Sequence, residues 1–155
     1  MPKIDIAAAE VRTGSGYPAP HDAPCAGRVR AKLGDAGGLD QFGVNLLTLQ
    51  PGVWSSQRHW HSREDEFCWV VEGEVVLIDD AGETVLRAGD CAAFKAGVAN
   101  GHHLVNRSDR IAKVLEVGTR NPAEDACDYP DIDMVARPGE DVYRHRDGTP
   151  YPAKG

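Results

Sequence analysis

The chain has 155 residues, of which 41% are hydrophobic and 26% charged, with a formal net charge of −7 and a pI near 5.3. These values fit one folded domain with its own core, and they argue against a nucleic-acid partner, which needs clustered basic charge. No apolar run approaches the ~20 residues of a membrane-spanning helix, and "MPKIDIAAAE" lacks the parts of a secretory signal, so we expect a cytoplasmic protein with no membrane partner.

The first 27 residues are rich in proline, glycine and alanine, as in "TGSGYPAPHDAPCAG". Such a composition predicts an irregular N-terminal arm, residues 1–27, rather than a packed element.

Short strands separated by turns are expected from residue 28 to residue 120. The expected strands lie within 28–34, 41–50, 55–61, 66–79, 82–89, 90–97, 102–108 and 110–119. Asp80, Ala81 and Gly82 suit a tight hairpin turn between two β-rich segments. Because no helical period is evident before residue 120, the pattern predicts an all-β sandwich or barrel.

Residues 121–155 are dense in aspartate, proline and arginine and poor in aliphatic residues. We expect a C-terminal tail that packs on the outside of the barrel, with one short helix near 131–137. The four cysteines (Cys25, Cys68, Cys91 and Cys127) form no CxxC pair, so free thiols are expected. Cys68 and Cys91 lie in apolar segments and are predicted to be small core residues.

Two of the six histidines stand at alternate positions, His59 and His61, with an acidic segment immediately after them. Residues two apart in a strand point to the same face, so both imidazoles would point together. If a turn over residues 62–65 reverses the chain, Glu66 faces the same cavity. The pattern predicts a metal site, with Glu64 and Asp65 left as solvated acids of the turn.

A second block of the same kind follows after Gly89. It contains Gly97, the pair His102 and His103, and Asn106.

These two blocks resemble the two motifs of the cupin superfamily. The first motif reads Gly52, His59-Trp60-His61, Glu66 and Gly73, and is nearly complete. The resemblance covers roughly residues 40–118 and implies a double-stranded β-helix, or jelly-roll, barrel over residues 28–120. It further implies one divalent metal ion in the mouth of this barrel.

The second motif departs from the family pattern at Lys95, where a proline is usual, and in a longer loop after Gly97. Counting forward from Gly97 puts Asn100 at the position of the family's histidine, whereas counting back from Asn106 puts His102 there. Imidazole is the better ligand for a transition metal, so His102 is preferred. His103 stays open as the alternative.

The metal ligands are therefore predicted to be His59, His61, Glu66 and His102. Three imidazoles and one carboxylate suit Fe, Mn, Ni, Co or Zn as the divalent ion, and the set leaves coordination positions open for chemistry. The pattern does not identify the ion.

Polar residues are expected around the ion by strand alternation. Ser55, Gln57, Cys68 and Asn45 are the candidate substrate-binding residues. Glu66 and Gln57 are the candidate catalytic residues, Glu66 as an acceptor of a proton. Arg28, Arg30, Arg58 and Lys113 are read as surface charges rather than as an anion clamp.

Three functions fit this site. A metal-dependent isomerase, epimerase or lyase of a small polar or sugar-like molecule is preferred, because the expected pocket is polar. An iron-dependent dioxygenase and a non-enzymatic ligand- or metal-binding cupin are the alternatives. A homodimer is also expected, because three tryptophans, Phe67 and Val71 fall on outward strand faces.

Overall fold

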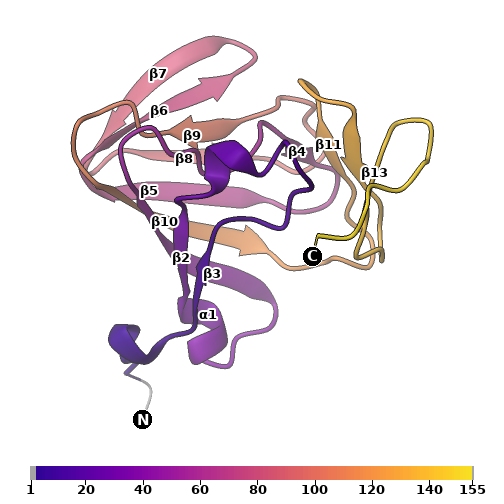
Figure 1. The fold of residues 1–155 in the computed structure, drawn as a ribbon. Helices are drawn as coiled ribbons and strands as arrows, with labels where there is room; N and C mark the ends of the chain where they lie inside the picture. Colours follow the sequence, from indigo (N-terminus) through magenta and orange to yellow (C-terminus); the bar gives the residue numbers. More distant parts are fainter. Residues whose placement is uncertain (1–2, 155) are drawn as a thin grey trace.

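The computed structural model describes residues 3–154, which form an all-β fold of antiparallel sheets (Figure 1). The largest sheet has the order β1-β2-β3-β10-β5-β8. Its strands are β1 (Val11–Thr13), β2 (Val29–Lys32), β3 (Phe42–Leu49), β10 (Ala112–Thr119), β5 (Glu66–Glu72) and β8 (Cys91–Phe94). The predicted all-β class is confirmed.

Two smaller sheets complete the structure. One has the order β7-β6-β9, made of β7 (Gly82–Arg87), β6 (Glu74–Asp79) and β9 (His103–Val105). The other has the order β13-β12-β11-β4, made of β13 (Tyr143–Arg144), β12 (Met134–Ala136), β11 (Cys127–Tyr129) and β4 (Trp60–His61). Within residues 3–154, helix is confined to η1 (Ile6–Ala8), η2 (Ala23–Cys25) and the single turn α1 (Leu33–Ala36). None of the helices in the described part of the chain is long and apolar enough to cross a membrane.

Alternate residues of the central strands build the main core. Leu47 and Leu49 of β3, Val70 of β5 and Val114 of β10 are fully buried, while their neighbours along each strand point outward. The turn between β5 and β6 needs glycine, because Gly73 has φ of +75° and a Cβ there would lie 2.6 Å from the Ile111 carbonyl oxygen. The predicted hairpin is confirmed, since Asp79 pairs with Gly82 across the β6–β7 turn.

The N-terminal arm differs from the predicted irregular segment. Strand β1 pairs with β2 and so extends the six-stranded sheet, and Tyr17 and Cys25 are buried. They join a second core with Cys127, Tyr129 and Met134 of the tail. This core consists of aromatic and sulfur-containing side chains, so the spacing of aliphatic residues in the sequence gives no sign of it.

The tail differs from its prediction as well. The segment expected to be helical forms β12 instead, and β11 pairs with β4 directly beside His61. Figure 1 shows these tail strands packed at one end of the barrel. Cys91 is exposed on the outward side of β8, so the prediction that it is a core residue was wrong, whereas Cys68 is buried as expected.

Candidate metal centre

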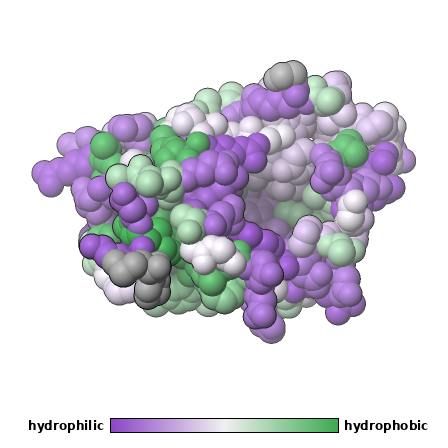
Figure 2. Space-filling view, turned by 90° about the horizontal axis from the view of Figure 1, so that it is seen from below, coloured by the Kyte–Doolittle hydropathy of each residue, from purple (hydrophilic) through white to green (hydrophobic). Residues whose placement is uncertain are grey.

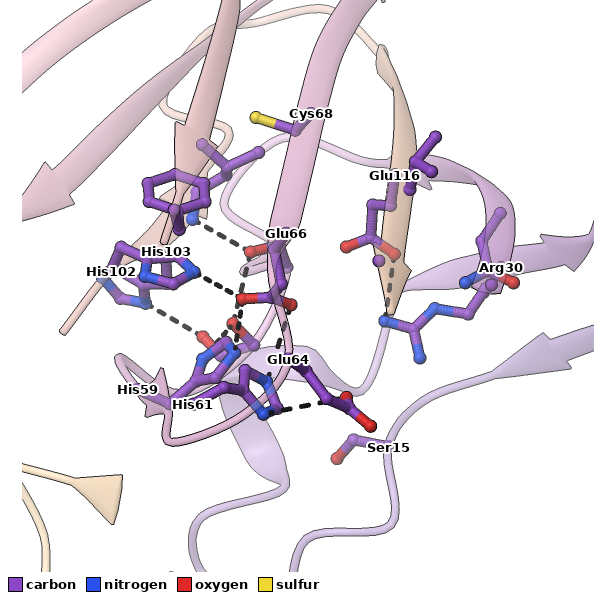
Figure 3. Close-up of a pocket in the computed structure, with 18 of the residues that line it drawn as sticks. Ser15, Arg30, His59, His61, Glu64, Glu66, Cys68, His102, His103 and Glu116 are labelled. Atoms are coloured by element: carbon purple, nitrogen blue, oxygen red, sulfur yellow. Dashed lines mark hydrogen bonds and ion pairs between the residues drawn. The ribbon is translucent and has the colours of Figure 1, made fainter. Parts of the chain in front are cut away.

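Three imidazoles converge on the carboxylate of Glu66 (Figure 3). The Nε2 atoms of His59 and His61 lie 3.5 and 3.6 Å from its two oxygens, and the Nε2 of His102 lies 2.8 Å away. At metal–ligand bonds of about 2.1 Å, neighbouring ligands of one ion lie about 3 Å apart. Donor atoms of His59, Glu66 and His102 all lie within 4.8 Å of one another and could hold one divalent ion, whereas His61 groups with His59 and Cys127 or with Glu64 and Asp125.

The backbone places two of these rings side by side. His59 and His102 form an isolated bridge, with the amide of each donating to the carbonyl of the other at 3.1 and 2.9 Å. Glu66 begins β5 opposite Gly118 of β10, where a Cβ would approach the Cγ of Glu66 to 3.7 Å. The ring of Phe94 stacks on His102 with centroids 3.5 Å apart. The side chains are thus positioned from several strands at once.

The other nitrogen of each ring faces an oxygen. The Nδ1 of His59 lies 2.8 Å from the Gln57 carbonyl, and the Nδ1 of His61 lies 2.6 Å from the carboxylate of Asp125. The Nδ1 of His102 lies 3.4 Å from the Asn100 carbonyl. Because these oxygens only accept hydrogen bonds, they favour a proton on Nδ1. With a cation bound, the Nε2 lone pair is then free to coordinate it, as in metal-binding histidines, whereas without a cation Nε2 must carry a proton to donate to the Glu66 carboxylate.

The charges of the cluster are strongly coupled. Burial by itself raises the pKa of Glu66, but hydrogen bonds from His102 and His59 outweigh it and hold that pKa well below its usual value. Burial lowers the pKa of His59, but Glu66 outweighs it and the pKa is raised. Among the described residues, no lysine or arginine pairs with Glu66, so only the imidazoles or a bound cation compensate its charge.

The two histidines of the second motif have different surroundings. His102 reaches Glu66, whereas His103 packs edge-on against Trp54 and places its Nδ1 2.9 Å from the Ser56 carbonyl. Asn100 is used elsewhere, because its side chain bonds the backbone of Asp80 and the carboxylate of Asp79. Lys95, which stands in place of the family's proline, pairs with Asp65 at 2.9 Å.

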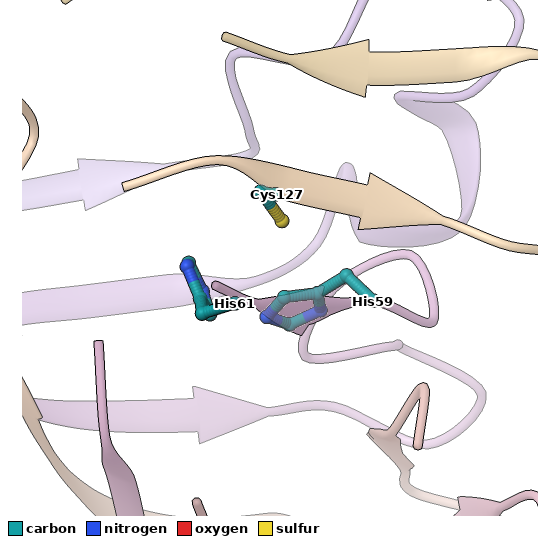
Figure 4. A group of neighbouring side chains, drawn as sticks. All are labelled: His59, His61 and Cys127. Atoms are coloured by element: carbon teal, nitrogen blue, oxygen red, sulfur yellow. The ribbon is translucent and has the colours of Figure 1, made fainter. Parts of the chain in front are cut away.

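Two residues beside the cluster were missed by sequence reasoning, and both come from the tail. Asp125 orients His61 and also accepts the backbone amides of Arg63 and Glu64. Cys127 lies close to His59 and His61 (Figure 4) and forms with them a group that could hold a metal ion, although burial raises the pKa of its thiol. In the sequence, the one sign of a role for Asp125 is that it lies two residues before Cys127 in an acidic tail.

A cavity of about 400 Å³ opens from the cluster, and its lining is mostly polar. Hydrophilic side chains surround a hollow on the face of the molecule seen in Figure 2. Of the predicted substrate-binding residues, Ser55, Asn45 and Cys68 line this cavity. Burial raises the pKa of Cys68 to about 11, so its thiol is not an effective base at neutral pH.

Gln57 does not belong to this lining. Its side-chain amide donates to the His21 carbonyl at 2.7 Å. A strand was expected over residues 55–61, but the structure has a strand there only at Trp60–His61, and His59 is held by an isolated bridge to His102. Because residues 55–58 are not in a strand, alternation fails there and Ser56 lines the cavity beside Ser55. The prediction that Gln57 contacts substrate is not supported by this geometry.

Charged residues were also misplaced by the sequence reasoning. Glu64, expected in solvent, lines the cavity and accepts the amide of Asn121, and burial raises its pKa. Arg28 and Arg30, read as surface charges, line the cavity too. Arg58 pairs with Asp80 and Asp131, and Lys113 pairs with Glu72, away from this lining.

Glu116 of β10 is a further cavity residue that sequence reasoning missed. It projects between Glu66 and Arg30 (Figure 3), and its carboxylate lies 3.2 Å from the Arg30 guanidinium. Burial raises its pKa, which Arg30 partly offsets. A carboxyl group of this kind is able to accept and return a proton.

Comparison with known proteins supports the interpretation of the fold. Residues 45–118 match the family model described as a cupin domain. A search of curated proteins finds no match. A solved structure from Silicibacter pomeroyi, named as a sugar phosphate isomerase from a cupin superfamily, shares 49% identity over 98% of both chains with a TM-score of 0.91.

Two more distant structures are also similar. A protein from Acidithiobacillus ferrooxidans, provisionally named as a sugar phosphate isomerase, shares 30% identity over 77% of this chain and 72% of its own, with a TM-score of 0.68. A predicted oxalate decarboxylase from Thermotoga maritima shares 20% identity over 76% of this chain and 98% of its own, with a TM-score of 0.58, and shows the fold alone. The chain belongs to the cupin superfamily.

Proposed function

We propose that the protein is a metal-dependent isomerase or epimerase of a small sugar-like molecule. One observation carries this proposal: Glu66, in contact with three histidines, opens into a polar cavity that also holds the half-buried carboxylate of Glu116. Isomerisation of a hydroxy-carbonyl compound needs both an electrophile and a base, and the cavity offers a candidate for each. The names of two similar structures point in the same direction.

The chain's residues would divide the work as follows. His59, His61, Glu66 and His102 would hold the ion, which supplies a Lewis acid that polarises a substrate oxygen. In an isomerisation, Glu116 would take a proton from the hydroxyl-bearing carbon next to the carbonyl and return it to the carbonyl carbon, while the hydroxyl proton passes to the former carbonyl oxygen. Arg30 would keep the Glu116 carboxylate directed into the cavity. Glu66 is engaged by three imidazoles, so we assign it as a ligand and not as the base.

Solvent exchange tests this assignment without knowledge of the product. Protein purified without chelators is analysed for bound metal and then incubated in D₂O with sugars, sugar phosphates and small acids. A proton that passes through a base exchanges with solvent, so we expect deuterium at one carbon of the substrate by NMR. Consumption of O₂ by the iron-loaded protein would instead identify a dioxygenase, and tight binding without any turnover would identify a binding protein.

A matched pair of variants identifies the base. Glu116→Gln should retain the metal yet lower deuterium incorporation by about 10²–10⁴-fold, the usual contribution of a general base. Glu72→Gln removes a carboxylate from the exposed end of β5 and should leave the rate unchanged. Equal rates in the two variants would exclude Glu116.

The expected homodimer is a second part of the proposal. On the outward side of β5, Phe67, Trp69 and Val71 are all exposed, Trp69 by 48%. On the same face of the sheet, Leu115 of β10 lies opposite Trp69, and Leu46 of β3 lies opposite Leu115. An apolar sheet face of this kind is covered in many proteins by a second copy. Light scattering should give twice the monomer mass, and Trp69→Glu should halve it, whereas Val85→Glu on β7 should not.

A further inference from the structure

The end of the cavity opposite the histidines has an unusual concentration of positive charge. Arg12 of β1 and Arg30 of β2 are directly opposite each other in the antiparallel register, and both line the cavity. Cβ atoms of such a pair lie about 5 Å apart, and like charges in this position destabilise a sheet. Arg12 is exposed to solvent and Arg30 is half-buried, so this positive charge favours an anion at the end of the cavity.

The described residues supply only part of that compensation. Glu116 pairs with Arg30, but Arg12 has no ion-pair partner among residues 3–154. Arg28, also in the lining and only 5% exposed, donates to the carbonyls of Gly14 and Ser55 and to no carboxylate in the same part of the chain. Three guanidinium groups against one carboxylate leave an excess of about two positive charges at this end.

Two buried polar atoms that line this cavity or belong to its lining residues have no hydrogen-bond partner among residues 3–154. The hydroxyl of Ser15 lines the cavity in a residue that is 7% exposed, and the Nε of Arg30 is likewise unsatisfied. Buried polar groups without partners are rare in folded proteins and cost free energy. Both atoms can donate a hydrogen bond, so both suit the same kind of ligand.

The absence of a side chain at Gly16 leaves space for the guanidinium of Arg12. A Cβ at Gly16 would lie 3.1 Å from the Nη2 of Arg12, so a side chain there would push this group aside. The neighbouring residue is Ser15, whose free hydroxyl lies against the same cavity. Arg12 and Ser15 are therefore placed as parts of one site.

We propose that Arg12, Ser15 and Arg30 form an anion subsite that binds the phosphate monoester of the substrate. A phosphate monoester carries close to two negative charges at neutral pH and several acceptor oxygens, which match the charge excess and the free donors. This assignment rests on the proposed function, because it defines which sugar derivative the cavity accepts.

The spacing of the strands supports a single molecule between the two ends. Three strand spacings of about 4.8 Å separate Glu66 on β5 from Arg30 on β2, and the inward side chains shorten this gap. Glu116 lies on the strand between them (Figure 3). A substrate held by its phosphate at Arg30 would present its carbon chain to Glu116 and its carbonyl end to the histidines.

Binding of inorganic phosphate tests the subsite separately from catalysis. Full-length protein is treated with chelator, so that phosphate has no metal to bind, and titrated by calorimetry. We expect one site, with an affinity lowered about tenfold or more by Arg12→Gln and by Ser15→Ala, as for the loss of charged hydrogen bonds. Arg12→Lys should retain part of the affinity, and Arg87→Gln on β7 should behave as wild type.

Three outcomes would overturn the subsite. They are no binding of phosphate to the wild-type protein, equal binding in Arg12→Gln and Arg87→Gln, and binding of acetate as tight as that of phosphate, which would assign a carboxylate instead. Metal content, measured before chelation, separates this failure from failure of the proposed function. Phosphate binding without metal would refute the metal-dependent enzyme alone, and metal without phosphate binding would refute the subsite alone.

Discussion

The two ends of the cavity are built on opposite principles. At the histidine end, each imidazole has an oxygen partner for Nδ1 and a common focus for Nε2, so the cluster is fully organised. At the arginine end, like charges face each other and two buried donors have no partner. Hydrogen-bond donors that the protein leaves without acceptors mark a place where a ligand can supply the acceptors. At the histidine end, by contrast, the side chains are already held in position by the protein's own hydrogen bonds.

Loss of a ligand at the histidine end should have the largest effect. His61→Ala removes one of the converging nitrogens, and we expect stoichiometric metal to disappear from the purified protein when it is measured by elemental analysis. His145→Ala, which changes an exposed histidine paired with Asp133, is the matched control and should keep its metal. A full complement of metal in His61→Ala would show that the ion binds elsewhere, and the histidine end would then not be a metal site.

The neighbouring pair His102 and His103 provides a sharper version of this test. His102→Ala should lose the metal, because its Nε2 faces Glu66, whereas His103→Ala should retain it. The second variant should instead lose the edge-on contact with Trp54 and unfold at a lower temperature. Metal loss in His103→Ala with retention in His102→Ala would reverse the assignment.

A smaller effect is expected from Asp125, which orients His61 without being a ligand. Asp125→Asn should weaken metal affinity by about 10–100-fold, the usual effect of removing such a partner, because an amide is a weaker acceptor from Nδ1. Affinity is measured by competition with a chromophoric chelator. Asp128→Asn, on β11 and paired with Arg146, controls for loss of a nearby carboxylate. Equal affinities in the two variants would show that Asp125 only closes the turn at Arg63 and Glu64.

The difference between the two ends also explains what the sequence could predict. The histidine end is encoded by local spacing: His59, His61 and Glu66 lie close together in the sequence, and the family motif adds His102. The strands of the barrel were predicted for the same reason, since period-2 alternation is a local signal. The structure confirms the all-β class and brings these four side chains together.

The arginine end depends on pairing between distant segments. Arg12 faces the cavity only because β1 joins the edge of the sheet, and the composition of residues 1–27 gave no sign of a strand. Arg28, Arg30 and Glu116 obey alternation, but alternation alone does not tell which face is inward when both carry polar residues. Asp125 was missed because β11 pairs with β4 across more than sixty residues of sequence.

The last prediction concerns Glu116, which lies between the two ends, and its effect is the smallest. Burial raises its pKa above the model-compound value of 4.5, and the charge of Arg30 offsets part of this. A carboxyl group with a raised pKa binds its proton more tightly in the folded protein. Its contribution to stability is therefore complete below pH 4.5 and is lost as the pH rises through the folded pKa.

Replacement of Glu116 by glutamine should remove this dependence. Relative to the chelator-treated wild type, Glu116→Gln should become progressively more stable as the pH rises from about 4 to about 7 in urea unfolding experiments. Any constant cost of leaving Arg30 without its partner shifts the whole curve but does not change its slope. A slope of opposite sign would mean that the arginines stabilise the charged carboxylate more than burial opposes it. Glu116 would then belong electrostatically to the arginine end as the ionised carboxylate that pairs with Arg30.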